Sequence, residues 1–187
     1  MNFIIVFIIN IIITSWLYRE AKTFYNDRIN KKKTIPKIYD VGIKYTPDLS
    51  HLKWLEYVSH FIALVLPFCF GSKIWYEYTS YIVTILLIRY MFIVLTVLPK
   101  YKGCDDKSVN ITNYIIGNCY DKIFSGHFAS VFLLTLILLQ NGYNLSYLVI
   151  FNIINAFIIL SLRYHYTIDL VVAMLVVMLV YQNKLTI

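Results

Sequence analysis

Charged residues are scarce in this chain: Asp, Glu, Lys and Arg make up 14% of its 187 residues, and hydrophobic residues make up 59%. A soluble domain usually has about 25% charged and about 45–50% apolar residues. Three cysteines are too few for a disulfide scaffold, and neither a metal-ligand spacing nor a nucleic-acid-binding motif is present. The composition therefore predicts an all-α, polytopic membrane protein with one domain over residues 1–187, without metal or cofactor.

The chain contains several long apolar runs. Each run approaches the roughly 20 residues that a bilayer-spanning helix needs, once flanking aromatic residues are counted. A basic polar segment, residues 19–56, separates the first two runs, and the first run also allows a signal peptide. The sequence predicts a six-transmembrane-helix bundle with spans at residues 3–17, 57–70, 80–98, 127–140, 145–162 and 167–182.

A histidine and an aspartate open the last apolar run. His165 and Asp169 are four residues apart, so on a helix they share one face. The carboxylate can accept a hydrogen bond from one imidazole nitrogen and leave the other nitrogen available for attack. Ionisable side chains at a membrane span are functional candidates. Two polar residues at the water boundary would give the same pattern.

A second histidine, His127, opens the fourth apolar run. Two membrane crossings separate it from His165, so the two histidines are predicted to lie at the same face. Arg89 lies within the third run, whose C-terminal end emerges on that face, and arginine side chains extend towards water. An arginine paired with carboxylates or carbonyls for structural reasons is the alternative for Arg89.

This set of side chains suits phosphoryl transfer through a histidine nucleophile. One histidine would attack phosphorus while Asp169 orients it, and the other would protonate the leaving oxygen. Arg89 would hold the phosphate oxygens. Ser125 is expected to cap the fourth helix, and the amides that follow, from Gly126 onward, offer positive potential to the same anion.

The two histidine segments resemble motifs of the sphingomyelin synthase family, a branch of the type 2 phosphatidic acid phosphatase (PAP2) superfamily. The family pattern Cys-Gly-Asp, three residues, Ser-Gly-His-Thr is similar to residues 119–128, and His-Tyr-Ser/Thr-x-Asp-Val is similar to residues 165–170. Arg89 and Thr96 match a third element on the third span. The fourth element, Pro-x-Pro-Asp, is present only as Pro47-Asp48. Tyr120 and Phe128 replace the family's Gly and Thr.

The resemblance implies a transferase that moves a phosphocholine or phosphoethanolamine head group from a glycerophospholipid to ceramide or diacylglycerol. The implied catalytic residues are His127, His165 and Asp169, with a phosphohistidine at His165. The implied substrate-binding residues are Arg89, Ser125 and Gly126. Arg163 is a further candidate for the phosphate, with a plain interfacial arginine as the alternative.

Two other functions stay open at this point. A lipid phosphatase would use water as the acceptor, although the phosphatase motif Lys-x6-Arg-Pro is absent. A catalytically silent lipid-binding protein is the second alternative. Membrane lipids are the expected partners, nucleic acid is not, and a homo-oligomer stays open.

Two lines of sequence evidence disagree about orientation. Lysine and arginine are concentrated on the side of the two histidines, so the positive-inside rule would place that side in the cytoplasm. The family resemblance implies the lumenal or extracellular side, and the sequon at Asn110 together with Cys104 and Cys119 favours it. We therefore expect a lumenal or extracellular active site. His51 and His60 flank the second span and are predicted to be interfacial.

Overall fold

The computed structural model describes residues 38–96, 98 and 123–186, together with isolated positions before residue 24. Within these ranges the chain is all-helical and has no β-strand, which confirms the predicted all-α class for the described part. Most of the first predicted span lies outside the described residues, as do Cys104, Asn110 and Cys119. The helical elements are α2 (Val41–Tyr45), α3 (Lys53–Leu64), the 3-10 helix η1 (Leu66–Phe70), α4 (Ser72–Leu95), α6 (Gly126–Gln140), α7 (Leu145–Ser161) and α8 (Thr167–Gln182).

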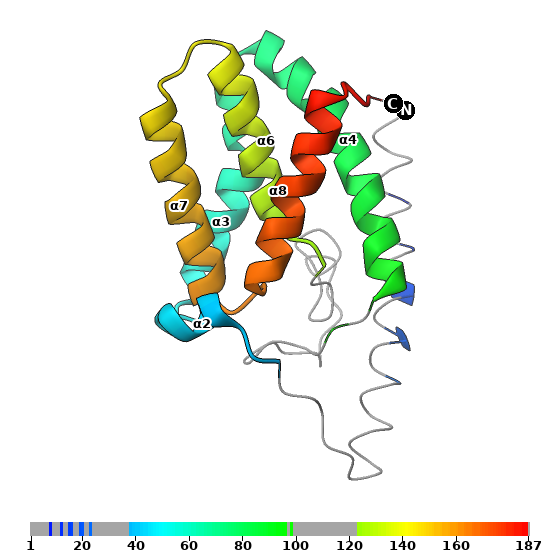
Figure 1. Cartoon of the computed structure of the whole chain (residues 1–187), viewed down its shortest axis with the longest axis vertical. Helices are drawn as coiled ribbons and strands as arrows, with labels where there is room; N and C mark the ends of the chain where they lie inside the picture. The colour runs from blue at the N-terminus through cyan, green and yellow to red at the C-terminus, as the bar shows by residue number, and fades with distance from the viewer. Residues whose placement is uncertain are drawn as a thin grey trace.

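Helix α6 is the centre of the bundle (Figure 1). It packs against α3, α4, α7 and α8, and most of its side chains are therefore buried. The sequence of α6 is apolar on every face, as expected for a helix with neighbours on all sides. The short helix α2 lies against the ends of α7 and α8.

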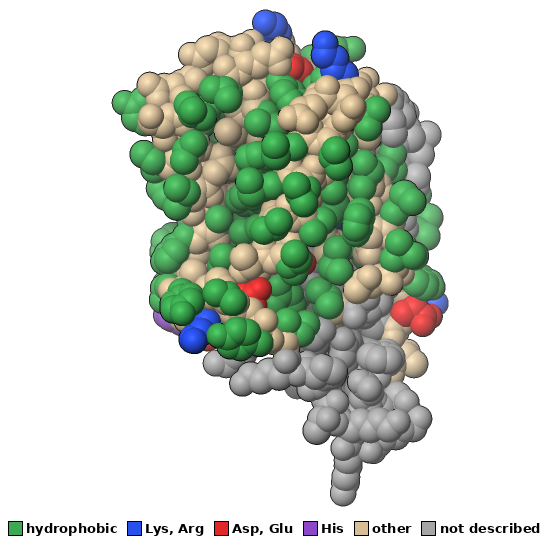
Figure 2. All heavy atoms as spheres, viewed as in Figure 1, with side chains coloured by type: hydrophobic (Ala, Val, Ile, Leu, Met, Phe, Trp, Pro, Cys, Tyr) green, Lys and Arg blue, Asp and Glu red, His purple; other side chains and the backbone are tan. Residues whose placement is uncertain are grey.

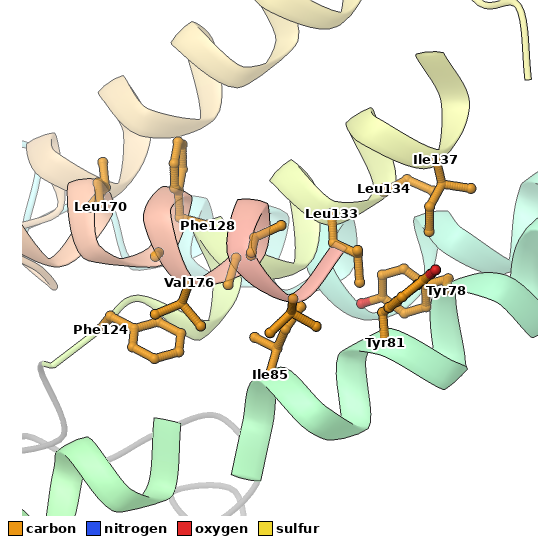
Figure 3. Close-up of a cluster of buried hydrophobic side chains, with 14 of the residues drawn as sticks. Tyr78, Tyr81, Ile85, Phe124, Phe128, Leu133, Leu134, Ile137, Leu170 and Val176 are labelled. Atoms are coloured by element: carbon orange, nitrogen blue, oxygen red, sulfur yellow. The ribbon is translucent and has the colours of Figure 1, made fainter. Parts of the chain in front are cut away.

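The core lies mainly between α4, α6 and α8 (Figure 3). Ile85 of α4, Leu133 of α6 and Val176 of α8 belong to this cluster. Ile85 and Leu133 are fully buried, and close packing of such side chains holds helices together through van der Waals contacts. The Tyr78 hydroxyl lies 2.6 Å from Ser130 Oγ, which also bonds to a backbone carbonyl of α3, so these buried hydroxyls are paired.

The helix boundaries agree with the sequence predictions in the second half of the chain and differ in the first. Helix α4 begins at Ser72, directly after Gly71 with φ 90°, and ends at Leu95 instead of covering residues 80–98. Its first turns carry Lys73 and Glu77 and therefore look like a polar loop in the sequence. The predicted span 57–70 consists of two pieces, α3 and η1, because Pro67 cannot continue an α-helix.

The outer surface of the bundle is largely apolar. Figure 2 shows hydrophobic side chains across the middle of one face, with Lys and Arg side chains near its two ends. Among the described helices, α4 is the one long and apolar enough to cross a membrane. Helices α6, α7 and α8 are also apolar but shorter. These facts agree with membrane association. The number of membrane crossings depends on whether α6, α7 and α8 are long enough to span a bilayer.

Candidate active site

The site forms where the N-termini of α6 and α8 meet. The backbone N–H of Ser125 donates to the carbonyl of Asp169 over 3.3 Å. Ser125 is fully buried, and its Oγ accepts the N–H of Phe128 over 3.2 Å, which caps α6 as the sequence predicts. The two histidine motifs therefore begin neighbouring helices at the same end of the bundle. Two helix N-termini at one place also give this end a positive potential.

His165 and Asp169 form a buried pair at the start of α8. Nδ1 of His165 lies 3.5 Å from Oδ2 of Asp169, and both side chains are almost fully buried. The same Oδ2 accepts the N–H of Tyr166 over 2.8 Å, which fixes the carboxylate against the helix start. Asp169 Oδ1 is buried and has no hydrogen-bond partner among the described residues. A buried, partly uncompensated carboxylate is more typical of a functional site than of a fold contact.

Arg89 reaches the same place from near the C-terminal end of α4. Its Nε donates to the carbonyl of Phe124 over 2.9 Å. A Cβ on Gly126 would stand 3.2 Å from this Nε and 3.5 Å from the guanidinium carbon. The glycine of the Ser-Gly-His segment therefore leaves room for the guanidinium against the first turn of α6.

His127 follows Gly126 on α6 and lies within electrostatic reach of His165 and Arg89. Its ring also contacts the ring of His60 from α3, with 4.2 Å between the centroids and an angle of 77° between the planes. The prediction that His60 is interfacial is therefore wrong, because His60 is buried. No motif marks His60 in the sequence; the available signal is a histidine inside an apolar helix.

Asp40 connects α2 to the start of α8, beside the histidine–aspartate pair. Its Oδ1 accepts the N–H of Ile43 over 2.8 Å and the hydroxyl of Thr167 over 2.7 Å, and its Oδ2 accepts the N–H of Thr167 over 2.8 Å. Burial raises the pKa of this carboxyl, but these hydrogen bonds outweigh burial and hold the pKa below its ordinary value. Asp40 caps two helices at once, which sequence reasoning did not predict.

Arg163 binds backbone at the other end of α2. Its Nη1 donates to the carbonyl of Ile43 over 2.9 Å, and its Nη2 donates to the carbonyl of Thr46 over 2.7 Å. Nη1 also bonds to Thr46 Oγ1 and to the carbonyl of Leu160. The described contacts therefore join Arg163 to α2 and α7 and not to the two histidines. Its predicted role in substrate binding stays a prediction.

Among the described residues, no group of three or more His, Cys, Asp or Glu side chains is arranged to hold a metal ion. The chemistry that these side chains can perform is nucleophilic and acid–base. A histidine backed by a carboxylate can attack an electrophile, and a second histidine can move a proton. An arginine at a helix N-terminus can bind a phosphate group. These three capacities belong together in phosphoryl transfer.

Comparison with known proteins points in the same direction. No curated protein matches this chain. The family model described as PAP2 superfamily C-terminal matches residues 118–185. This range includes Ser125, Gly126, His127, His165 and Asp169. Members of this superfamily are generally phosphoryl-transfer enzymes that act on lipids, both phosphatases and lipid phosphotransferases. Over these residues the chain is similar to the PAP2 superfamily.

Proposed function

We propose that this protein is a sphingomyelin synthase-like transferase, which moves a phospho-head-group from a glycerophospholipid to ceramide or diacylglycerol. The observation that carries the proposal is the buried His165–Asp169 pair, 3.5 Å apart, at the junction of two helix N-termini. A carboxylate beside Nδ1 favours the tautomer with the proton on Nδ1, so the lone pair is on Nε2. His165 is thus suited to act as the nucleophile.

The first half-reaction transfers the head-group phosphate to His165. Nε2 attacks phosphorus, a P–N bond forms, and the P–O bond to diacylglycerol breaks. His127 donates its proton to the departing oxygen, so diacylglycerol leaves as a neutral alcohol. The Asp169 carboxylate stabilises the positive charge on the His165 ring, and Arg89 holds the phosphate oxygens. The products are a phosphohistidine carrying the head group and a neutral His127.

The second half-reaction runs in the opposite direction with a new alcohol. His127 takes the proton from the acceptor hydroxyl as that oxygen attacks phosphorus. The P–N bond breaks, and its electron pair returns to Nε2 of His165. If water enters in place of the lipid, the same residues catalyse hydrolysis. The acceptor that reaches His127 therefore decides between transfer and hydrolysis.

A lipid substrate agrees with the apolar surface, and we propose six membrane spans. Helices α6, α7 and α8 have 15, 17 and 16 residues, which corresponds to lengths of about 23–26 Å. A hydrocarbon core of about 30 Å is only slightly thicker. Large apolar side chains are exposed along the last two helices, such as Ile153 and Phe157 on α7 and Leu175 and Leu179 on α8. We place the site on the lumenal or extracellular side.

The test is a reconstituted assay with phosphatidylcholine that carries a labelled head group, supplied together with ceramide and diacylglycerol. Wild-type protein should transfer the label to ceramide, or to a diacylglycerol whose acyl chains differ from those of the donor, and form an acid-labile phosphoenzyme. His165→Ala and Asp169→Ala should both abolish transfer. His51→Gln, at an exposed histidine outside the site, is the matched control and should keep the wild-type rate.

Three results would contradict the transferase. Release of free phosphocholine without a new phospholipid would indicate hydrolysis, with water as the acceptor. Copurified lipid without any turnover would indicate a lipid-binding protein. Wild-type rates in either site variant would place the chemistry at other residues.

A further inference from the structure

We propose that His60 of α3 is a positioning residue that holds the imidazole of His127 in the orientation needed for proton transfer. This inference rests on the proposed function and adds to it a residue from a helix that none of the motifs includes. It also gives α3 a role in catalysis in addition to its packing against α6.

The geometry at His127 supports this role. The two ring centroids are 4.2 Å apart and the ring planes make an angle of 77°. Edge-to-face aromatic pairs usually have centroids about 4.5–7 Å apart, so this contact is slightly closer than the usual range. His60 is buried at 7% exposure, and its neighbour Ser59 is buried at 2%. A surface histidine that merely touched His127 would not be enclosed in this way.

The chemistry requires such a contact, because a histidine ring does not orient itself. Its second side-chain torsion is broad and roughly two-fold, so the Cβ position alone does not say where the nitrogens point. A proton donor must bring one nitrogen within hydrogen-bond distance of the leaving oxygen. A ring packed edge-to-face against His127 excludes most of the alternative orientations.

The backbone around His127 is held on the other side. Ser125 caps α6, and Arg89 packs on Gly126. Helix α6 also packs against α3 directly. The backbone of His127 is therefore fixed by the cap, and the ring is fixed by His60. Loss of His60 should leave the helix in place but free the ring.

The experiment separates proton donation from every other step by changing the leaving group. Phosphatidylcholine releases an alcohol that needs a proton, whereas p-nitrophenyl phosphocholine releases a phenolate that leaves without one. Release of each leaving group is measured in a single turnover without acceptor. The ratio of the two rates does not depend on how much of a variant is folded, so a destabilised variant still gives an answer.

His60→Ala should lower diacylglycerol release at least tenfold and change nitrophenolate release less than twofold. His60→Phe keeps a ring at the contact and should restore the ratio to within about threefold of wild type. His127→Asn, which removes the donor itself, should show the same selective loss in stronger form. Ser59→Ala, at the buried neighbour, is the matched control and should leave the ratio unchanged.

Several results would overturn the positioning role. If His60→Ala lowers both release rates equally, His60 only supports the fold. If His60→Ala changes neither rate, the contact with His127 has no role in catalysis. A Phe variant as impaired as the Ala variant would exclude the ring contact as the cause. If wild type forms no phosphohistidine with either substrate, the proposed function itself fails. If His127→Asn selectively lowers diacylglycerol release while His60→Ala leaves the ratio of the two rates unchanged, only the inference about His60 is overturned.

Discussion

The Nε atom of Arg89 lies 3.2 Å from the position that a Cβ on Gly126 would occupy. An alanine at this position must push the guanidinium away from the start of α6, because Cβ contacts this short are rare. We expect Gly126→Ala to lower kcat/KM by about tenfold, corresponding to about 1.4 kcal/mol of transition-state binding. The measurement is the labelled-lipid assay described above.

A double-mutant cycle provides the control for this effect. In an Arg89→Ala background the crowding is gone, so adding Gly126→Ala should change the remaining kcat/KM very little. An equal fold loss of kcat/KM from Gly126→Ala in both backgrounds would mean that the glycine serves another purpose.

Replacing Arg89 by lysine should separate charge from geometry. Lysine keeps the positive charge but loses the planar fork and the Nε donor that binds Phe124. We expect Arg89→Lys to insert and fold but to lose tenfold or more in kcat. Lys73→Gln, at an exposed lysine in the first turn of α4, is the matched control and should be silent. A fully active Arg89→Lys would place the phosphate clamp elsewhere, with Arg163 as the next candidate.

The pH dependence of stability should contain a contribution from Asp40. Its pKa is lowered in the folded protein, so its contribution is complete above the unfolded value of about 3.9 and is lost as the pH falls through the lower folded value. We expect the melting temperature in detergent to fall on acidification below about pH 4. Asp40→Asn should melt lower at neutral pH, since helix caps contribute roughly 1 kcal/mol each.

Asp40→Asn should also lack the part of the acid transition that Asp40 causes. Identical acid transitions in wild type and Asp40→Asn would contradict the assignment.

Arg163→Lys distinguishes a fold contact from a phosphate contact. A lysine cannot make the bonds that Arg163 makes to the carbonyls of Ile43 and Thr46 at once. We therefore expect a lower melting temperature, with the activity of the folded protein changed less than twofold. A large loss of activity at unchanged stability would instead support the substrate-binding role.

The features that could be predicted are those set by local sequence patterns, such as apolar runs and short motifs. Helices α6, α7 and α8 are apolar runs, and their predicted bounds agree with the structure within one residue. The start of α4 was missed because its first turns are polar and lie at the end of the bundle. Counting the predicted spans led to the prediction that the two histidines lie at the same face, and both motifs begin helices at one end of the bundle.

The missed features are contacts between distant residues that carry no local pattern. His60 looks like any histidine next to an apolar run, and only the packing of α3 on α6 brings it to His127. The double cap of Asp40 joins a loop near the start of the chain to the last helix. Arg163 has a positive φ of 64°, and its bonds to α2 likewise cross most of the chain. A single sequence cannot indicate which distant partner such a side chain will meet.

The bond between Asp40 and Thr167 also sets an order of events during synthesis. The two residues are 127 positions apart, and a ribosome adds about 5–20 residues per second. Asp40 therefore waits roughly 6–25 seconds after its own synthesis before its partner exists. The bond that joins α2 to the start of α8 can form only after residue 167 has been made. Closure of this end of the bundle is thus a late step in biogenesis, and a nascent chain released before residue 167 would lack it.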